Sequence, residues 1–481
     1  MFMPNEWADH STAALDRRAA SGADLHLEIS GPGLRAGLVS SLREAVRSGR
    51  LAPGSRLPSS RSLAVDLGVA RNTVADAYAE LVAEGWLTAK QGSGTRVARR
   101  AEARAVNRTG GGRSGGRPTY ALMPGAPNLA EFPRAQWLAA ARRALASAPN
   151  DAFGYGDTAG RVELRTVLAD YLARSRGVYA APERIVICAG FHHGLMLVAE
   201  AFKARRERTI AVESYGFDVY RRLLMSAGLR ITPIGVDESG ARTAELADLP
   251  GVHAVLLTPA HQYPTGVELH ARRRAEVIDW ARTTGGLILE DDYDGEFRYG
   301  RQPIGALQGL DPERVAYFGS ASKSLAPALR IAWMVLPEDL VSDVVAAKGA
   351  VDWTSAVEQL TLAEFIGSGA YDRHVRRMRL QYRRRRDQLV SALAQRAPRI
   401  RVSGVAAGLQ ALVELPHGSE RAVVEAAARH GLAVSGLSEY RFAEAGFELM
   451  PSSRDALVVG YSSPSDSAWQ GALDTLCRVL P

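Results

Sequence analysis

The sequence predicts an α/β protein in two parts: a small helical unit with a β-hairpin, then a larger body built around a mostly parallel sheet. Three observations predict this fold class. At 481 residues the chain is too long for one ordinary domain. The segment from Ala98 to Pro118 is rich in Gly and Arg and almost free of large apolar residues, which is typical of a flexible linker. Beyond it, short apolar runs alternate with helical patterns.

Composition indicates a soluble protein of the reducing cytoplasm. Hydrophobic residues make up 46% of the chain and charged residues 23%, as in globular proteins. The net charge of +7 permits contact with nucleic acid without requiring it. Two cysteines, Cys188 and Cys477, form neither a disulfide framework nor a zinc site. We read no signal peptide at the N-terminus and no membrane span, and we expect no metal.

Three helices and a hairpin are predicted before the linker. Leu34, Leu38, Leu42 and Val46 form one apolar stripe, which ends near Gly49. A second helix follows a Pro and begins with a Ser suited to an N-cap, in "SSRSLAVDLG". The stretch "ARNTVADAYAELVAEG" predicts the third helix, and "WLTAKQGSGTRVAR" predicts two short strands around a Gly-rich turn.

The second and third helices fit a helix-turn-helix. Gly68 suits the turn, and the third helix opens with Arg71, Asn72 and Thr73, whose side chains are suited to base edges in the major groove. Arg61 begins the preceding helix, where backbone amides favour phosphate. The hairpin adds candidate contacts at Lys90, Gln91, Gly92, Gly94 and Arg96. A three-helix interaction module with solvated charges is the alternative.

The stretch from Gly49 to Ala98 resembles the GntR-type winged helix-turn-helix almost throughout. The pieces "LPSSR", "RNTV", "L..EG" and "G.GT.V" occur in order. The resemblance covers roughly residues 24–98 and implies a DNA-binding domain there, followed by a linker over 99–119 and a body over 120–481. It implies DNA contacts at Arg61, Arg71, Thr73 and Gly92, while Asn72 stands where the family varies.

Six apolar runs of the body are strand candidates: "RIVICAG", "TIAVES", "AVLLTPA", "GLILEDD", "VAYFGS" and "IAWMVLP". Helical patterns such as "HGLMLVAEAF" and "ARRRAEVIDWARTTG" lie between them. This alternation predicts a mostly parallel sheet with helices on its faces. After about Pro337 the pattern turns more helical and ends in alternating pieces, which predicts a smaller α+β subdomain.

The lysine in "YFGSASKSLAPALR" is a candidate reactive group. Only four of the 59 basic residues are lysine, at positions 90, 203, 323 and 348. A lysine amine can form a Schiff base with an aldehyde, which arginine cannot do. Lys323 follows an apolar run and is flanked by Ser320 and Ser322, which precede it, and Arg330 adds a fixed charge suited to phosphate. Aldehyde and phosphate together indicate pyridoxal 5′-phosphate; a surface lysine after a strand is the alternative.

Acidic residues follow the apolar run "LILEDD". A pyridinium nitrogen needs one carboxylate partner, which Asp291, Asp292 or Asp294 can supply, and Tyr293 can hydrogen-bond the ring hydroxyl. A solvated acidic loop is the alternative, but it does not explain the apolar strand before it.

Two further stretches contain candidate ligand contacts. In "ICAGFHHGLMLVAEAF" a helix begins after a Gly turn, so the backbone N–H groups of Gly190, Phe191 and His192 offer a phosphate cradle. His192 and His193 are adjacent and therefore make a poor metal pair. In "TPAHQYPTG", His261 and Gln262 can reach a ligand, although the stretch alone is an ordinary loop.

Taken together and in this order, these stretches resemble the fold-type I pyridoxal-phosphate aminotransferases over roughly residues 120–481. The pieces "HQYPTG" and "EDDYDGEFRY" and the lysine motif are most similar to the MocR-like regulators, which join a GntR-type head to an aminotransferase-like body. The resemblance implies an internal aldimine at Lys323, a pyridine-nitrogen partner in Asp291 and a ring-hydroxyl contact in Tyr293. It implies phosphate contacts from Ser320, Ser322, Arg330 and the amides near His192, and ring stacking by Phe217 in place of a Tyr.

One departure concerns the arginine with which aminotransferases bind the substrate carboxylate. The matching strand here, Ala456 to Ser463, contains no arginine. Arg441 or Arg454 are the open alternatives. The resemblance therefore implies a homodimeric, DNA-binding transcription regulator that senses pyridoxal phosphate or an amino compound, with the branch controlling vitamin B6 synthesis favoured over amino-acid sensors. A working aminotransferase with a DNA-binding head and a scaffold protein without cofactor are the alternatives.

Overall fold

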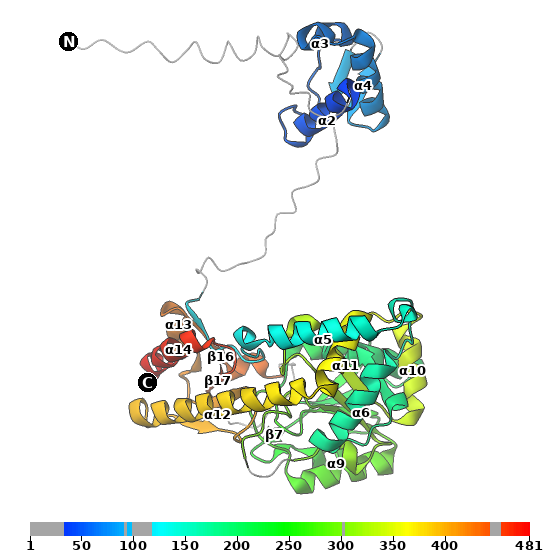
Figure 1. Cartoon of the computed structure of the whole chain (residues 1–481). Helices are drawn as coiled ribbons and strands as arrows, with labels where there is room; N and C mark the ends of the chain where they lie inside the picture. Colours follow the sequence, from blue (N-terminus) through cyan, green and yellow to red (C-terminus); the bar gives the residue numbers. More distant parts are fainter. Residues whose placement is uncertain (1–32, 91–93, 99–117, 301–303, 443–453) are drawn as a thin grey trace, which may run out of the picture. The chain divides into compact units, whose positions relative to one another are not determined.

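The computed structural model describes residues 33–90, 94–98, 118–300, 304–442 and 454–481. The chain divides into two compact units, Met1–Ser114 and Gly115–Pro481, which we describe separately (Figure 1). None of the described helices combines the length and apolarity that crossing a membrane requires.

The described residues of the head form three helices and one hairpin. Its elements are α2 (Leu34–Arg47), α3 (Ser60–Leu67), α4 (Arg71–Ala83), β1 (Leu87–Lys90) and β2 (Gly94–Val97), the two strands being antiparallel. The Ser59 side chain accepts a hydrogen bond from the Ser62 N–H and caps α3, as expected. Gly68 ends α3 with a left-handed φ of 65°, which turns the chain into α4.

The apolar stripe of the first helix forms most of the head's core. Leu38 and Leu42 are buried against Leu63, Val74 and Leu81 of the two following helices. The prediction was wrong for Leu34, whose side chain is 58% exposed. It is the first residue of α2, one turn beyond the point where α4 covers the helix.

A seven-stranded sheet forms the centre of the body, in the order β4-β12-β11-β10-β9-β5-β6. The strands are β4 (Ile185–Cys188), β5 (Thr209–Glu213), β6 (Arg230–Ile234), β9 (Ala254–Leu257), β10 (Leu287–Asp291), β11 (Val315–Ser320) and β12 (Ala332–Val335). All neighbours pair in parallel except β12, which is antiparallel to both β11 and β4. The six predicted strands are confirmed, and the expectation of a mostly parallel sheet is confirmed with them.

Helices cover both faces of this sheet. Alternate residues of β4 point in opposite directions: Val186 and Cys188 pack with α7, whereas Ile185 and Ile187 pack with α6 and α11. The helices of this part are α5 (Arg134–Ser147), α6 (Val162–Arg176), α7 (Phe191–Ala204), α8 (Asp218–Ser226), α9 (Ala271–Thr284), α10 (Glu338–Lys348) and α11 (Ala356–Gly367). The short pair β7 (Val236–Asp237) with β8 (Gly240–Ala241) also belongs to this part, whereas β3 (Tyr120–Ala121) and β15 (Leu432–Ala433) pair with each other beside α13 (Glu420–Arg429) and α14 (Asp466–Val479).

The end of the chain forms the smaller α+β subdomain, drawn orange to red in Figure 1. Its antiparallel sheet contains β13 (Arg401–Ser403), β14 (Gln410–Glu414), β17 (Ala456–Gly460) and β16 (Ser435–Gly436), packed with α13 (Glu420–Arg429) and α14 (Asp466–Val479). The long helix α12 (Ala370–Arg396) contacts α11 at one end and α14 and β13 further along. It thereby joins the two parts of the body.

Candidate functional site

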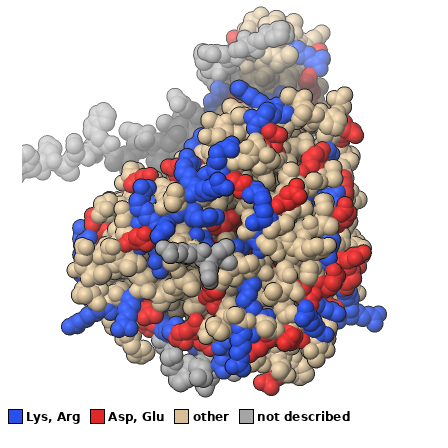
Figure 2. Space-filling view, turned by 60° about the horizontal axis from the view of Figure 1, so that its bottom comes forward, with Lys and Arg blue, Asp and Glu red and all other residues tan. Residues whose placement is uncertain are grey.

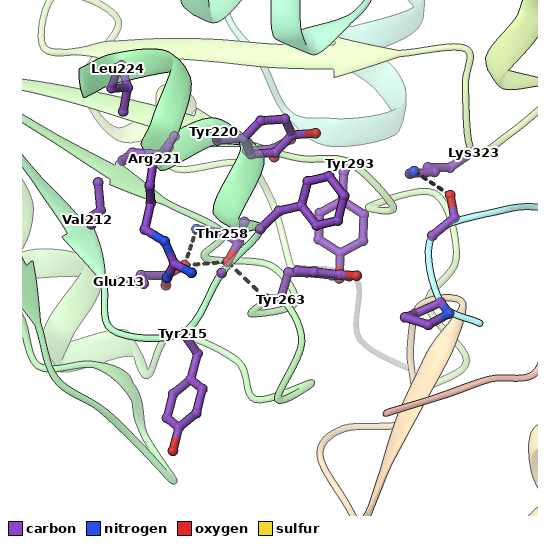
Figure 3. Close-up of a pocket in the computed structure, with 16 residues that line it drawn as sticks. Val212, Glu213, Tyr215, Tyr220, Arg221, Leu224, Thr258, Tyr263, Tyr293 and Lys323 are labelled. Carbon is purple, nitrogen blue, oxygen red and sulfur yellow. Dashed lines mark hydrogen bonds between the residues drawn. The ribbon is translucent and has the colours of Figure 1, made fainter. Parts of the chain in front are cut away.

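A cavity of about 190 Å³ opens where three parallel strands of the large sheet end. Lys323 lies on one side of it, and the apolar side chains of Val212 and Leu224 lie on the opposite side (Figure 3). Its other lining residues come from the ends of β5, β9 and β10, from α8 and from the segment before α5: Pro124, Gly125, Glu213, Tyr215, Gly216, Phe217, Tyr220, Arg221, Leu256, Thr258, Tyr263, Asp291 and Tyr293. Ligand sites of open α/β sheets form at such strand ends.

The Lys323 amine faces this cavity from the turn after β11. Its Nζ donates a hydrogen bond to the carbonyl of Gly125. Burial lowers the pKa of Lys323, and the nearby carboxyls of Asp291 and Asp294 act in the opposite direction. Burial therefore favours the neutral, nucleophilic form of this amine.

Asp291 is the last residue of β10 and lies in the cavity wall. Its side chain is buried, and it makes no hydrogen bond within the described part of the chain. Burial raises the pKa of Asp291 well above its usual value, while the charge of Lys323 opposes that shift. A buried carboxyl in this situation is suited to a donor or cation supplied by a ligand.

The three aspartates that the sequence left open lie in different surroundings. Asp292 forms a buried ion pair with Arg176, at 2.6 Å, and accepts a hydrogen bond from the Tyr317 hydroxyl at 2.8 Å. Asp294 lies 2.8 Å from Nδ1 of His261. Only Asp291 of the three lines the cavity.

Tyr293 lines the cavity, and two side chains outside the cavity lining fix the position of its hydroxyl. Its hydroxyl accepts a hydrogen bond from Nε2 of Gln410 at 2.7 Å and lies 3.0 Å from Nδ1 of His261. His261 and Gln262 themselves do not line the cavity. The Gln262 amide instead donates to the carbonyls of Tyr215 and Tyr263, at 3.0 and 2.7 Å, and so ties two wall segments together.

Several of the predicted phosphate residues lie near one another, although they are not part of the lining of the Lys323 cavity. Ser320 pairs with Ala332 and Ala332 pairs with Cys188, so the ends of β11 and β4 lie near each other. Gly190 precedes α7 with a φ of 90°, and a Cβ atom there would lie 3.3 Å from the Arg330 guanidinium. Arg330 donates to the Ala189 carbonyl at 2.6 Å.

The groups around this point are suited to an anion. The first residues of α7, Phe191 and His192, present N–H groups at a helix N-terminus. The Phe191 ring packs on Phe318 and Tyr220, so only its backbone faces the site. The hydroxyls of Ser320 and Ser322 make no hydrogen bond within the described residues.

Phe217 lies at the N-terminus of α8 and its ring is 44% exposed. The ring lines the cavity and forms edge contacts with Tyr220 and Tyr263, at centroid distances of 5.4 and 6.2 Å. An exposed aromatic ring at the edge of a cavity is available to stack on a flat ligand.

The sequence prediction missed Glu213, the buried last residue of β5. One of its carboxyl oxygens accepts hydrogen bonds from the Thr258 N–H and hydroxyl and from Gln262, at 2.6 to 3.2 Å. Burial raises the pKa of Glu213 to about 7. The sequence did contain a usable indication, because Glu213 is an acidic residue at the end of an apolar run. The same pattern indicated Asp291.

The predicted DNA contacts of the head lie on its surface. Arg71 and Asn72 are exposed at the N-terminus of α4, Thr73 is half-buried beside them, and Arg61 is exposed in the first turn of α3. The predicted contacts Gln91 and Gly92 lie outside the described residues. No group of three or more metal-binding side chains occurs among the described residues of either unit.

Known proteins share both parts of this chain. Residues 34–97 match the family "Bacterial regulatory proteins, gntR family", and residues 125–448 match "Aminotransferase class I and II". The regulator PdxR of Corynebacterium glutamicum, named for pyridoxine biosynthesis, is 33% identical over 84% of this chain and 88% of its own length. The probable rhizopine catabolism regulator MocR of Rhizobium meliloti is 32% identical over 84% and 86%.

The chain belongs to the MocR-like transcriptional regulators. Its body also resembles solved aminotransferases. An archaeal alanine:glyoxylate aminotransferase superposes with a TM-score of 0.67 at 24% identity, over 75% of this chain and 90% of that one. A kynurenine aminotransferase of Pyrococcus horikoshii gives a TM-score of 0.65 at 23% identity, over 75% and 90%. At these identities the likeness shows the fold alone.

The strand that carries a carboxylate-binding arginine in aminotransferases is apolar in this MocR-like chain. Val458 of β17 is fully buried in a cluster with Leu412, Leu437 and Tyr440. The two alternatives do not line the Lys323 cavity: Arg441 and Arg454 line a separate cavity of about 280 Å³, and Arg454 pairs with Glu238.

Among the described residues that line the Lys323 cavity, Arg221 is the one arginine, and its guanidinium already has partners. Its guanidinium donates to the carbonyls of Tyr440 and Arg441, at 3.3 and 3.4 Å, and lies over the Phe442 ring. Burial lowers its pKa, and the charge of Asp218 opposes that shift. Arg221 thus holds the subdomain segment against the cavity wall.

Proposed function

We propose that this MocR-like regulator binds pyridoxal phosphate at the Lys323 cavity and changes its DNA binding in response to pyridoxal phosphate itself or to a small amine. The observation that carries the proposal is that the amine of Lys323 and the carboxyl of Asp291 line the same cavity. Both groups are buried, and the Asp291 carboxyl has no hydrogen-bond partner among the described residues. We place the protein in the cytoplasm, where its DNA lies.

The described residues fit this cofactor. Pyridoxal phosphate supplies an aldehyde that condenses with amines and a pyridinium ring that withdraws electrons. Lys323 is the attachment point for the aldehyde, Asp291 the partner of the ring nitrogen and Tyr293 the partner of the ring hydroxyl. Phe217 stacks on the ring. The phosphate contacts are Gly190, Phe191, His192, Ser320, Ser322 and Arg330, while His261 and Gln262 position the wall.

Two observations favour a sensor over a catalyst. The cavity has no free arginine for a substrate carboxylate among its described residues, since Arg221 binds backbone carbonyls. Opposite Lys323 lie the apolar Val212 and Leu224, and the charged residues on that side, Glu213 and Arg221, already have hydrogen-bond partners. The relative named for pyridoxine biosynthesis suggests the effector: we infer that the chain controls vitamin B6 metabolism with pyridoxal phosphate as its signal.

Absorbance and DNA binding test the proposal together. Full-length protein incubated with pyridoxal phosphate should gain an absorbance band near the visible edge, which Lys323→Ala abolishes and the surface variant Lys203→Ala keeps. Gel shifts on the DNA upstream of the chain's own coding sequence should change on adding pyridoxal phosphate, for the wild type and Lys203→Ala only. A cofactor band without any effect on DNA binding would overturn the sensor role.

An active aminotransferase is the second candidate, because an amine, a ring-nitrogen carboxylate and a phosphate site suited to that chemistry lie together. A steady-state assay with a panel of amino donors and keto acids separates the two functions. Sustained turnover would make catalysis the main role, whereas a single half-reaction without turnover agrees with sensing.

A further inference from the structure

Helix α12 of the body carries an unusual concentration of positive charge. Its 27 residues, Ala370–Arg396, include nine arginines and two aspartates, a net charge of 9 − 2 = +7. The whole chain also has a net charge of +7, from 59 basic and 52 acidic residues. The rest of the chain is therefore neutral, with 59 − 9 = 50 basic and 52 − 2 = 50 acidic residues. The excess charge of the protein is that of this one helix.

Part of this charge has a structural use. Arg385 is buried and donates to the carbonyls of Tyr461, Ser462 and Pro464 and to Asp466. Other arginines of α12 have partners at the helix surface: Arg396 pairs with Asp474, Arg377 with Glu131, and Arg379 donates to the Glu296 carbonyl.

Three exposed arginines have no such use. Arg376, Arg383 and Arg384 make no hydrogen bond or ion pair within the part of the chain that the structure describes. Arg376 and Arg383 are seven residues apart, two turns of one helix face, or about 10 Å along the axis. We call these three residues the α12 arginine face. Figure 2 shows many basic side chains on the face of the body turned toward the viewer, with acidic side chains among them.

A hollow and a groove border the α12 arginine face. Arg376 borders the hollow with Arg298 and Arg379, and its acidic lining residues are Asp372, which pairs with Arg174, and Glu296. Arg383 and Arg384 border an open groove between α12 and α14, where Gln388, Gln395 and Gln470 add amide groups and Asp387 is the one acidic lining residue. Guanidinium and amide groups together are typical of surfaces that contact phosphate.

We propose that the α12 arginine face binds the phosphate backbone of duplex DNA, outside the bases that the head reads. The proposal rests on DNA binding by the head and not on the cofactor. The head holds DNA on the same chain, so the local DNA concentration at the body is high and even weak phosphate contacts are populated. A protein partner fits less well, because between residues 376 and 384 only Leu380 is an exposed large apolar side chain, and protein interfaces need central apolar anchors.

The test compares two triple variants of the full-length protein on the duplex upstream of its own coding sequence. The first is Arg376→Gln/Arg383→Gln/Arg384→Gln. The second removes three exposed arginines elsewhere on the body that also have no ion pair among the described residues, Arg142→Gln/Arg208→Gln/Arg429→Gln. Both lose the same total charge. Circular dichroism and the cofactor absorbance band show that each variant is folded.

The expected result is a difference in salt dependence. Each lost phosphate contact lowers the slope of log affinity against log salt by about 0.9, so the first variant should lose up to about 2.7 while the second keeps the wild-type slope. Equal slopes for both variants would overturn the proposal. Dissociation of the first variant to a smaller oligomer would instead make the face a contact between copies. Loss of binding to anionic lipid vesicles with unchanged DNA binding would make it a membrane contact. DNA binding by the head variant Arg71→Ala, measured in the same way, tests separately whether the head contacts DNA.

Discussion

The Asp291 carboxyl is the group on which the cofactor proposal depends most. Its neighbour Asp292 has a buried arginine, Arg176, as its ion-pair partner and accepts a hydrogen bond from Tyr317, whereas the Asp291 side chain has neither an ion pair nor a hydrogen bond within the described residues. Burial without a partner disfavours the charged form, and the raised pKa of Asp291 reflects this. Leaving the site without a ligand therefore costs stability, and a cationic ring nitrogen removes that cost.

Substituting the two aspartates should give opposite results. Asp291→Asn removes an unpaired buried carboxyl, so the cofactor-free protein should melt at the same or a higher temperature, while pyridoxal phosphate should stabilise it far less than the wild type. Asp292→Asn leaves the Arg176 charge buried without a carboxylate and should cost about 3–5 kcal/mol. Thermal melts with and without pyridoxal phosphate measure both effects. A large loss of cofactor-free stability in Asp291→Asn would contradict this account.

Glu213 should make the stability of the body depend on pH. Burial raises its pKa from 4.5 to about 7, so between these values the folded chain keeps a proton that the unfolded chain has released. The contribution of Glu213 to the stability of the body is then highest below pH 4.5. It falls by about 3 kcal/mol in total as the pH rises toward 7. Glu213→Gln should remove this part of the decline in urea unfolding across that pH range. The exposed Glu183→Gln serves as control; an identical pH profile for wild type and Glu213→Gln would refute the prediction.

At the scale of elements, Lys348 joins three segments of the body. It ends α10, and its fully buried amine donates to the carbonyls of Thr158 and Ile187 and pairs with Asp352 at 2.7 Å. The end of β4, the segment before α6 and the segment before α11 are thereby fixed to one another. Among the four lysines of the chain, Lys348 has a structural role, whereas the role we propose for Lys323 is chemical.

Replacing Lys348 with Met should destabilise the body by about 3–5 kcal/mol, because Asp352 loses its ion-pair partner and the carbonyls of Thr158 and Ile187 lose a buried donor. The surface variant Lys203→Met should change stability by less than about 0.5 kcal/mol. Calorimetry of the full-length chain measures both variants. An unchanged unfolding temperature of the body in Lys348→Met would show that the amine does not hold these segments together.

Strands that are continuous apolar runs were predictable from the sequence, whereas a strand whose residues include proline or exposed charge was not. The six apolar runs became strands because burial on both faces of a parallel sheet demands continuous apolar residues. Strand β6 was missed: "RITPI" contains Pro233 and begins with an exposed Arg230, which an edge strand tolerates and a central strand does not.

The candidate site shows the same limit. The sequence placed Lys323 and the acids after β10 near one ligand, since parallel strand ends meet at one edge of a sheet. From the residues alone the choice among Asp291, Asp292 and Asp294 stayed open, and only the family resemblance favoured Asp291, because the surroundings of the three acids depend on Arg176 and His261, which reach them from distant parts of the chain. Nor could the sequence exclude Arg441 and Arg454, which only the placement of β17 and its neighbours separates from the Lys323 cavity.

At the scale of the whole molecule, an exposed aromatic surface suggests how two chains associate. Tyr155 is 94% exposed and Trp353 74% exposed, and each lies in one of the segments that Lys348 joins. Phe153 and Val351 are also exposed there. Single exposed apolar residues are ordinary, whereas several on adjoining segments mark an interaction site. We infer that this surface lies in the interface of a homodimer, which would bring two heads to two DNA half-sites.

Trp353→Asp should therefore convert the protein toward monomers, because it places a charge where two apolar surfaces meet. Light scattering measures the mass of the full-length protein, and gel shifts should show weaker DNA binding as the second head is lost. Tyr179→Asp is the matched control, since Tyr179 is 67% exposed on another part of the body and should leave the mass unchanged. Because Lys348 fixes both segments, Lys348→Met should weaken the dimer as well. A Trp353→Asp protein with the wild-type mass would place the contact between chains elsewhere on the body.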